Sequence, residues 1–461
     1  MSDLFGIINL GLSALTAHRT AVDVTSHNLA NANTPGYSRQ EALLATNPPL
    51  PPAGTAAAIV GGQTGTGVHV QAVRRAQEAF LALQSRTFRS ELGRWSAAAP
   101  PLKEVESVLS PAPGTDLSAL LDRFWDAWDT VANAPEDLGL RETLLGTAAT
   151  LVDSFREASQ RLQTIRLTTD VGITSRINEV NTLARQVAEL NRQIQVALAE
   201  GRSPNDLLDS REIALDRLAE LCGAMPFLSE GGHLIIYLDG RPLVQGSAAF
   251  SLSVTTGSQG VQITTSYDGQ PVRVSNGEIG GLLQARDAAI PAYLQRLDAV
   301  ASALVSQVNA LHEAGYGLDG NTGVSFFVGG TTAGDIALDP AVAADGRAIA
   351  ASASGAPGDG SVALRIANLR TRPVLRGRTL SEAAQDLIGT LGDEIASCDA
   401  RADSQQTALD QLQQQQQSVS GVSIDEELVY LTLSQRAYEA AARIITAADE
   451  MLATIIERMA A

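Results

Sequence analysis

Apolar residues recur every seven positions at both ends of this chain of 461 residues. The N-terminal set is Ile8, Leu15, Val22 and Leu29, and the C-terminal set is Ile424, Leu431, Tyr438, Ile445 and Leu452, with Leu428 at a companion position four residues on. A seven-residue apolar repeat is typical of a helix that packs along another helix. The sequence therefore predicts a long helix at each end.

Both predicted helices have recognisable boundaries. The first should end near Asn31, because Thr34-Pro35-Gly36-Tyr37 places proline and glycine at the centre of a type II turn. Ser423 and Glu426 are spaced as a capping box for the second. Covering six large apolar positions contributes on the order of 10 kcal/mol, provided that a partner covers them. The spacing leaves two arrangements open: the ends pair with each other, or each stripe faces a globular core.

The N-terminal apolar stretch is also long enough for a secretory signal peptide. However, Ser2 and Asp3 stand where a signal peptide carries cations, and the first cation is Arg19. We therefore expect a retained helix. No apolar run reaches the roughly 20 residues that a membrane-spanning helix needs.

The middle of the chain combines long helical patterns with one β-rich insert. Residues 46–71 are rich in Pro, Gly, Ala and Thr, which predicts an extended arm. Residues 72–223 and 278–419 predict a bundle of long helices. Residues 224–277 alternate apolar and polar side chains around Asp239-Gly240, which predicts a small inserted β domain.

Composition and motifs argue against catalysis. The chain has 51 acidic and 33 basic residues, a net charge of −18, which opposes binding to nucleic acids and to anionic membranes. Two cysteines cannot form a disulfide framework. The five histidines are scattered, and the glycine-rich stretch 61–67 fits no phosphate-binding spacing. We predict no catalytic, cofactor-binding or metal-ligating residues, although a catalytic triad assembled in space stays open.

Two terminal segments carry a resemblance to a known family. Residues 28–40, NLANANTPGYSRQ, resemble the N-terminal signature of bacterial flagellar axial proteins, the rod, hook and hook-associated proteins. Residues 435–443, QRAYEAAAR, and 448–452, ADEML, resemble their C-terminal signature. The helical middle and residues 203–211, SPNDLLDSR, are most similar to the hook-associated members, whereas rod and hook proteins are β-rich between their ends.

The resemblance implies a mainly α fold in which residues 1–45 and 420–461 pair as a coiled coil inside the central bundle, with the β domain facing outward. It assigns Asn28, Asn31, Pro35, Gly36 and Tyr37 to a family signature turn. It also implies an extracellular structural role in the bacterial flagellum, reached by type III export without a cleaved signal peptide. Copies would assemble into a helical array at the hook–filament junction, with hook protein below and the next hook-associated protein above. An export chaperone would bind the C-terminal helix.

Alternative functions are another flagellar axial protein, a hook or rod component, and a secreted helical adhesin or enzyme. We also expect that the free monomer keeps both ends disordered until assembly, because an uncovered apolar stripe favours aggregation.

Overall fold

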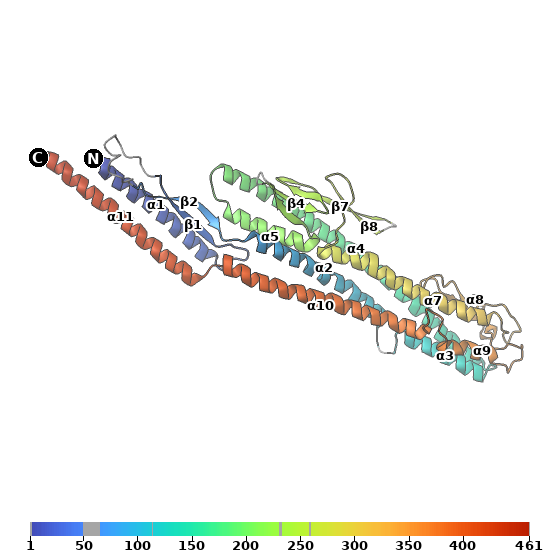
Figure 1. Ribbon diagram of the computed structural model, residues 1–461. Coiled ribbons are helices and arrows are strands. Elements are labelled where there is room, and N and C mark those ends of the chain that lie inside the picture. Colours follow the sequence, from blue (N-terminus) through green and yellow to red (C-terminus); the bar gives the residue numbers. More distant parts are fainter. Residues whose placement is uncertain (1, 49–64, 113, 230–232, 258–259, 461) are drawn as a thin grey trace.

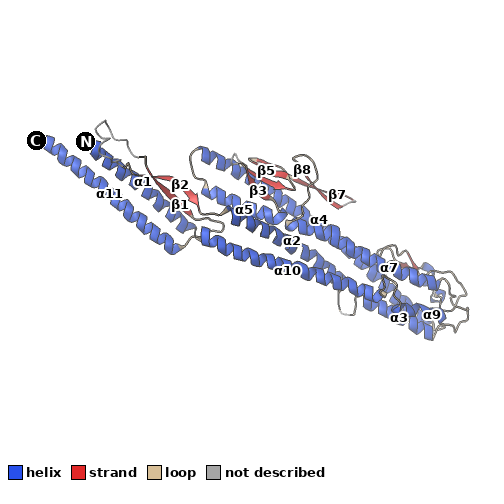
Figure 2. Ribbon diagram, viewed as in Figure 1, coloured by secondary structure: helices blue, strands red, loops and turns tan. Residues whose placement is uncertain are grey.

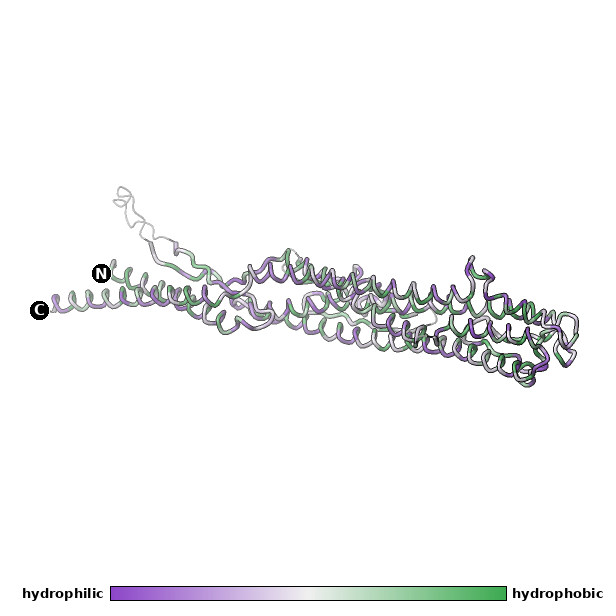
Figure 3. Tube along the Cα trace, turned by 90° about the horizontal axis from the view of Figure 1, so that it is seen from below, coloured by the Kyte–Doolittle hydropathy of each residue, from purple (hydrophilic) through white to green (hydrophobic). Residues whose placement is uncertain are grey.

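The computed structural model describes residues 2–48, 65–112, 114–229, 233–257 and 260–460. Two views show a slender molecule in which a pair of terminal helices continues, end to end, into a body of long helices (Figures 1 and 3). Both chain termini lie at the same far end of the terminal pair (Figure 1).

The terminal helices α1 (Ser2–Asn31) and α11 (Ile424–Ala460) pair with each other in antiparallel directions. A Cβ added to Gly11 of α1 would lie 2.7 Å from Cγ1 of Ile445, which shows how closely the backbones approach. The spacing had left two arrangements open, and the observed one is that in which the two ends pair with each other. Pairing within one chain half-buries most of the seven-residue stripes, and the expectation that both ends stay disordered before assembly stays a prediction.

The companion position of the α11 seam differs from the expected one. Ala441 and Ala448 are buried and Ser434 is half-buried, three residues after each large apolar residue of the repeat. Leu428, which was expected at a position four residues on, is 45% exposed. Small side chains let two helices approach closely, so the seam is occupied by Ala and Ser where the sequence suggested Leu.

A two-stranded antiparallel ladder, β1 (Gln40–Thr46) and β2 (Val68–Arg75), lies beside α1 (Figure 2). The arm expected at 46–71 and the helix expected from Ala72 are therefore wrong over 68–75, which forms a strand with an irregularity between Val70 and Ala72. Residues 49–64 of the expected arm lie outside the described residues. Gly67 has φ +103°, and a Cβ there would lie 2.0 Å from the Ser13 hydroxyl, so this crossing requires glycine.

The body is a bundle of long helices, as predicted. Its helices are α2 (Ala79–Leu109), α3 (Leu117–Asn133), α4 (Leu138–Ala199), α5 (Asn205–Cys222), α6 (Gly277–Gln284), a π-helical turn (Ala285–Ala289), α7 (Ile290–His312) and α10 (Leu380–Ser420). The core at the far end of the body is aromatic: Phe124 and Trp128 of α3 pack against Phe326 at ring-centroid distances of 6.0 and 5.1 Å.

An irregular excursion between α7 and α10 closes that end of the body. It contains β9 (Phe327–Val328), β10 (Ala337–Leu338), α8 (Pro340–Ala344), α9 (Ser361–Ala367) and two 3₁₀ turns (Gly346–Ala348 and Asn368–Thr371). Buried His312 holds it, accepting from the amide of Ala350 (2.8 Å) and bonding the carbonyl of Val324 (2.7 Å). Burial lowers the pKa of His312 to about 4, so the ring is neutral at pH 7.

The inserted β domain packs on the side of α4 (Figure 2). Strands β3 (Met225–Leu228), β4 (Leu234–Leu238), β5 (Arg241–Gln245) and β6 (Ala248–Ala249) form one antiparallel sheet, and β7 (Leu252–Gly257) pairs with β8 (Gly260–Thr265). Asp239 and Gly240 both have positive φ, 52° and 73°, as a tight hairpin turn requires. None of the described helices is long and apolar enough to cross a membrane.

Candidate assembly site at the waist

Three connections cross at the waist, which we define as the narrow region where the terminal pair meets the body. They are residues 32–39 after α1, 76–78 before α2 and 421–423 between α10 and α11. The amide of Arg39 donates to the carbonyl of Ser420 (2.9 Å), and the amide of Ala76 donates to the carbonyl of Arg39 (2.8 Å). These bonds tie the three connections together.

The signature turn forms as predicted from Thr34 to Tyr37. The amide of Tyr37 donates to the carbonyl of Thr34 (3.2 Å), and Gly36 has φ +78°. A Cβ on Gly36 would also lie 2.6 Å from Cδ1 of Ile213 in α5, so both backbone conformation and space call for glycine. Pro35 is exposed, and Asn31 donates to the carbonyl of His27 (3.0 Å), capping the end of α1.

Asn28 is the centre of the waist, with only 1% of its surface exposed. Its amide nitrogen donates to the carbonyl of Gln40 (2.8 Å) and to Glu427 (3.0 Å). Its amide oxygen accepts from the amide of Gln40 (2.9 Å) and the hydroxyl of Tyr37 (2.7 Å). Every hydrogen-bonding position of this side chain is used, and only an amide supplies two donors and two acceptor sites in this geometry.

Glu427 is a carboxylate that is 2% exposed at the start of α11. Nε of Arg39 donates to it at 2.7 Å, and the Arg39 guanidinium lies 5.5 Å from the centroid of the Tyr430 ring. Burial alone would lower the pKa of Arg39, but its bond to Glu427 raises the value above the usual range. Burial, with nearby Asp206, Asp209 and Glu427, raises the pKa of Tyr37. The Arg39 guanidinium therefore stays charged and the Tyr37 hydroxyl stays neutral at pH 7.

The first turns of α5 attach this cluster to the body. Asn205 donates to Gln40 Oε1 (2.9 Å), and Gln40 Nε2 donates to Asp206 (2.9 Å). Asp209 accepts from the amide of Ser38 (3.1 Å) and from Arg75 (2.7 Å). The terminal pair is therefore held to the body by oriented polar bonds.

Sequence reasoning missed Glu427, Asn205 and Asp209 as waist residues. One signal could have identified Glu427. It lies seven positions before Ser434, so it falls on the line of α11 that faces α1, where an acidic residue is unexpected. Asn205 and Asp209 lie in the segment 203–211, whose only signal in the sequence is its resemblance to the flagellar axial proteins. Their partners lie more than 100 positions away in the sequence, so spacing could not identify them.

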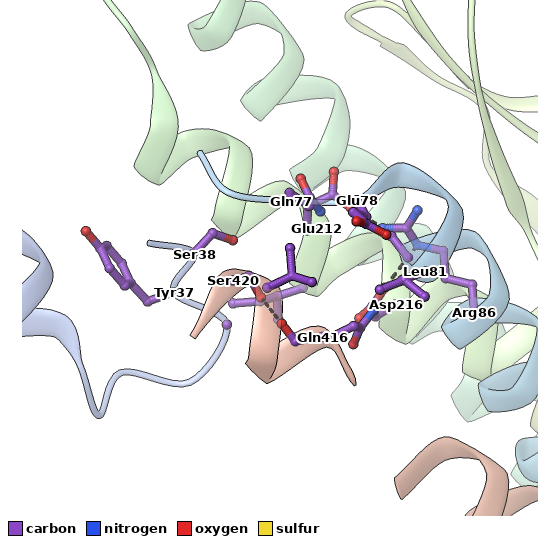
Figure 4. Close-up of a pocket in the computed structure, with 14 residues that line it drawn as sticks. Tyr37, Ser38, Gln77, Glu78, Leu81, Arg86, Glu212, Asp216, Gln416 and Ser420 are labelled. Atoms are coloured by element: carbon purple, nitrogen blue, oxygen red, sulfur yellow. Dashed lines mark hydrogen bonds and ion pairs between the residues drawn. The ribbon is translucent and has the colours of Figure 1, made fainter. Parts of the chain in front are cut away.

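A cavity of about 150 Å³ lies beside the signature turn, between α2, α5 and α10 (Figure 4). Arg86, which is almost fully buried, pairs there with Glu212 and with Asp216 at 2.9 Å. Burial raises the pKa of Asp216, and Arg86 and Arg89 oppose this. Because these charges satisfy one another, the cavity supports a structural role for the waist better than a catalytic one.

The predicted assembly residues lie in two different regions of the structure, the waist and the pair of terminal helices. Asn28, Gly36 and Tyr37 lie at the waist. Ile8, Leu15, Val22 and Leu29 are half-buried along α1, and Leu431, Ile445 and Leu452 are half-buried along α11. Tyr438, on the same line of α11, is 36% exposed. Their role in assembly stays a prediction.

Comparison with known protein families agrees with this architecture. The family model described as the flagellar hook-associated protein FlgK helical domain matches residues 102–327. The flagella basal body rod protein model matches residues 8–37, and the flagellar basal body rod FlgEFG protein C-terminal model matches residues 413–458. Flagellar hook-associated protein 1 of Bacillus subtilis is 27% identical over 100% of this chain and 99% of its own length.

The chain belongs to the flagellar hook-associated protein 1 family. It is therefore a structural protein of the bacterial flagellum, outside the cell. The family member from Salmonella typhimurium is 28% identical over 70% of this chain, which spans only 59% of that relative.

A solved structure is similar to this chain in fold. It is the flagellar hook junction protein FlgK from Burkholderia pseudomallei, with a TM-score of 0.65 and 18% identity. The match covers 73% of this chain and 100% of that chain.

Proposed function

We propose that this chain polymerises at the distal end of the hook and forms the junction on which the filament assembles. In this role it is a structural subunit without catalytic activity. The division into a terminal pair, a helical body and an outward-facing β domain is part of the proposal, with the terminal pair as the inner layer.

A second apolar stripe on α11 carries the proposal. It follows alternating spacings of three and four along the helix: Tyr430, Leu433, Ala437, Ala440, Ile444, Ala447 and Met451. At 100° per residue this stripe lies about a third of the way round the helix from the seam with α1. Leu433 is 63% exposed and Met451 is 47% exposed, so α1 leaves the stripe uncovered.

An uncovered stripe of this length indicates a protein partner, because isolated apolar residues are common on surfaces but continuous stripes are not. A neighbouring copy fits it through an unlike surface, the type of contact that builds helical arrays. At the ends of the array, hook protein below and the next hook-associated protein above would replace that copy. Before assembly, an export chaperone would cover the same face by a helix-in-groove contact. Export through the flagellar type III system without a cleaved signal belongs to the same proposal.

The test places a charge on this stripe and, as a control, on the polar face of the same helix. Ile444→Asp interrupts the stripe, whereas Thr446→Asp adds the same charge at an exposed position two residues away. In cells lacking the gene we expect hooks without filaments and flagellin in the medium. Thr446→Asp should restore filaments in electron micrographs, and Ile444→Asp should not. Equal restoration by both variants would refute the assigned face, and missing hooks would move the protein to the hook or rod.

A further inference from the structure

A second cavity, of about 230 Å³, lies between the end of α4, α5 and the inserted β domain. Its lining includes Arg192, Arg211, His233 and Ser247, and none of the described residues that line it is Asp or Glu. A cation-lined cavity is unexpected in a chain with a net charge of −18.

Arg211 is the centre of the argument. It is half-buried, and its Nε is buried without a hydrogen-bond partner. Within the described residues its side chain donates one hydrogen bond, from Nη1 to the amide oxygen of Asn191 (3.1 Å), which is a neutral acceptor. Within the described ranges Arg211 forms no ion pair. A buried guanidinium nitrogen without a partner is unfavourable, because it loses hydration without compensation.

The surroundings of Arg211 increase its need for an anion. Burial lowers its pKa, and nearby Arg75 and Arg86 lower it further, whereas Glu212 opposes them. Arg75 and Arg86 have carboxylates of their own, Asp209 for the first and Glu212 and Asp216 for the second. At the cavity, Arg192 pairs with Glu189 on the exposed side of α4. Among the residues that the structure describes, Arg211 therefore remains without a carboxylate partner.

The cavity is built to hold Arg211 in position. Asn191, only 5% exposed, donates to the carbonyl of Gly246 (2.8 Å) while its oxygen accepts from Arg211. One buried amide thus fixes the arginine relative to the β domain. A planar carboxylate matches the donor pattern of a guanidinium better than a spherical ion does.

We propose that this cavity binds a carboxylate, with Arg211 as the main ligand. Two sources supply this chemistry: an acidic side chain of a neighbouring copy in the array, or a small free carboxylate. Binding of a side chain from a neighbouring copy rests on the proposed function, whereas binding of a small free carboxylate does not.

The first experiment uses the purified full chain and sodium acetate as the probe, with sodium chloride at equal ionic strength as the reference. A ligand that binds only the folded state raises its Tm in a saturable way. We expect such a rise in the wild type and its loss in Arg211→Gln. Ser247→Glu, which adds a carboxylate to the lining, should raise Tm without acetate and abolish the response, whereas the matched Ser247→Gln should keep it.

Circular dichroism checks that each variant is folded. If Arg211→Gln does not fold, Ser247→Glu still tests the proposal, because it adds a carboxylate to the lining and keeps Arg211. An equal Tm in acetate and chloride for the wild type, together with an unchanged Tm in Ser247→Glu, would overturn the proposal.

The second experiment separates the two sources in polymerised protein. If a neighbouring copy supplies the carboxylate, acetate and Ser247→Glu should each raise the critical concentration for polymerisation, and Ser247→Gln should not. If the ligand is a small carboxylate, polymerisation should be unchanged and the acetate response should persist in the polymer. Failure of the acetate experiment leaves the flagellar role intact, since that role is tested on α11.

Discussion

At the scale of single residues, the waist depends on side chains whose hydrogen bonds no residue of equal shape reproduces. Asn28 donates and accepts two bonds each while almost fully buried. Glu427 receives one of those bonds and the charge of Arg39. Hydrogen bonds of this kind contribute modestly when made, but losing one partner leaves a buried group unsatisfied.

Asn28→Asp tests this dependence with almost no change in volume. The new carboxylate cannot donate, and it would lie about where the amide nitrogen now sits, 3.0 Å from the Glu427 carboxylate. We expect a loss of roughly 2–5 kcal/mol in the free energy of unfolding, measured by urea denaturation. Asn33→Asp, at an exposed position just after α1, should change it by less than about 0.5 kcal/mol. Similar losses for the two variants would contradict the role given to Asn28.

At the scale of elements, the terminal pair depends on close approach of two backbones at Gly11. Gly11→Val places a branched side chain against Ile445, where even a Cβ would lie 2.7 Å from Cγ1. We expect overpacking to cost about 1–3 kcal/mol and to expose both terminal helices to proteases. Gly6→Val is the matched control, since a Cβ at Gly6 has no neighbour within 4 Å. Equal protease resistance of the two variants would show that the helices do not pair at this point.

The elements differ in how far the sequence predicts them. The end of α1 at Asn31 and the turn at Gly36 depend on neighbouring residues in the sequence. Such local features can be predicted from the residue types and their spacing. The strand over 68–75 was missed because its partner strand, 40–46, is separated from it by a long Pro- and Gly-rich stretch. The companion position of the α11 seam was expected four residues after each repeat, at Leu428, whereas close packing buries the positions three residues on, Ala441 and Ala448. The waist could not be predicted, because its bonds join residues far apart in the sequence.

At the scale of the whole molecule, the exposed apolar surface favours association of copies and the net charge opposes it. The molecule is slender, and a long apolar stripe on α11 is exposed. Each copy also carries a net charge of −18, which repels every other copy. Assembly in the proposed array therefore requires apolar contact to exceed a repulsion that acts over about a Debye length.

Salt should accordingly promote polymerisation. Raising the ionic strength from about 0.02 to about 0.3 M shortens the Debye length from roughly 20 Å to below 10 Å, which weakens the repulsion between copies. It leaves the apolar contact on α11 nearly unchanged. We expect the critical concentration of the purified chain, measured by light scattering, to fall several-fold, while the Tm of the monomer changes little. Ile444→Asp should not polymerise at either salt concentration, because screening cannot replace the lost apolar contact. A critical concentration that rises with salt would mean that ion pairs between copies, rather than the α11 stripe, dominate the contact.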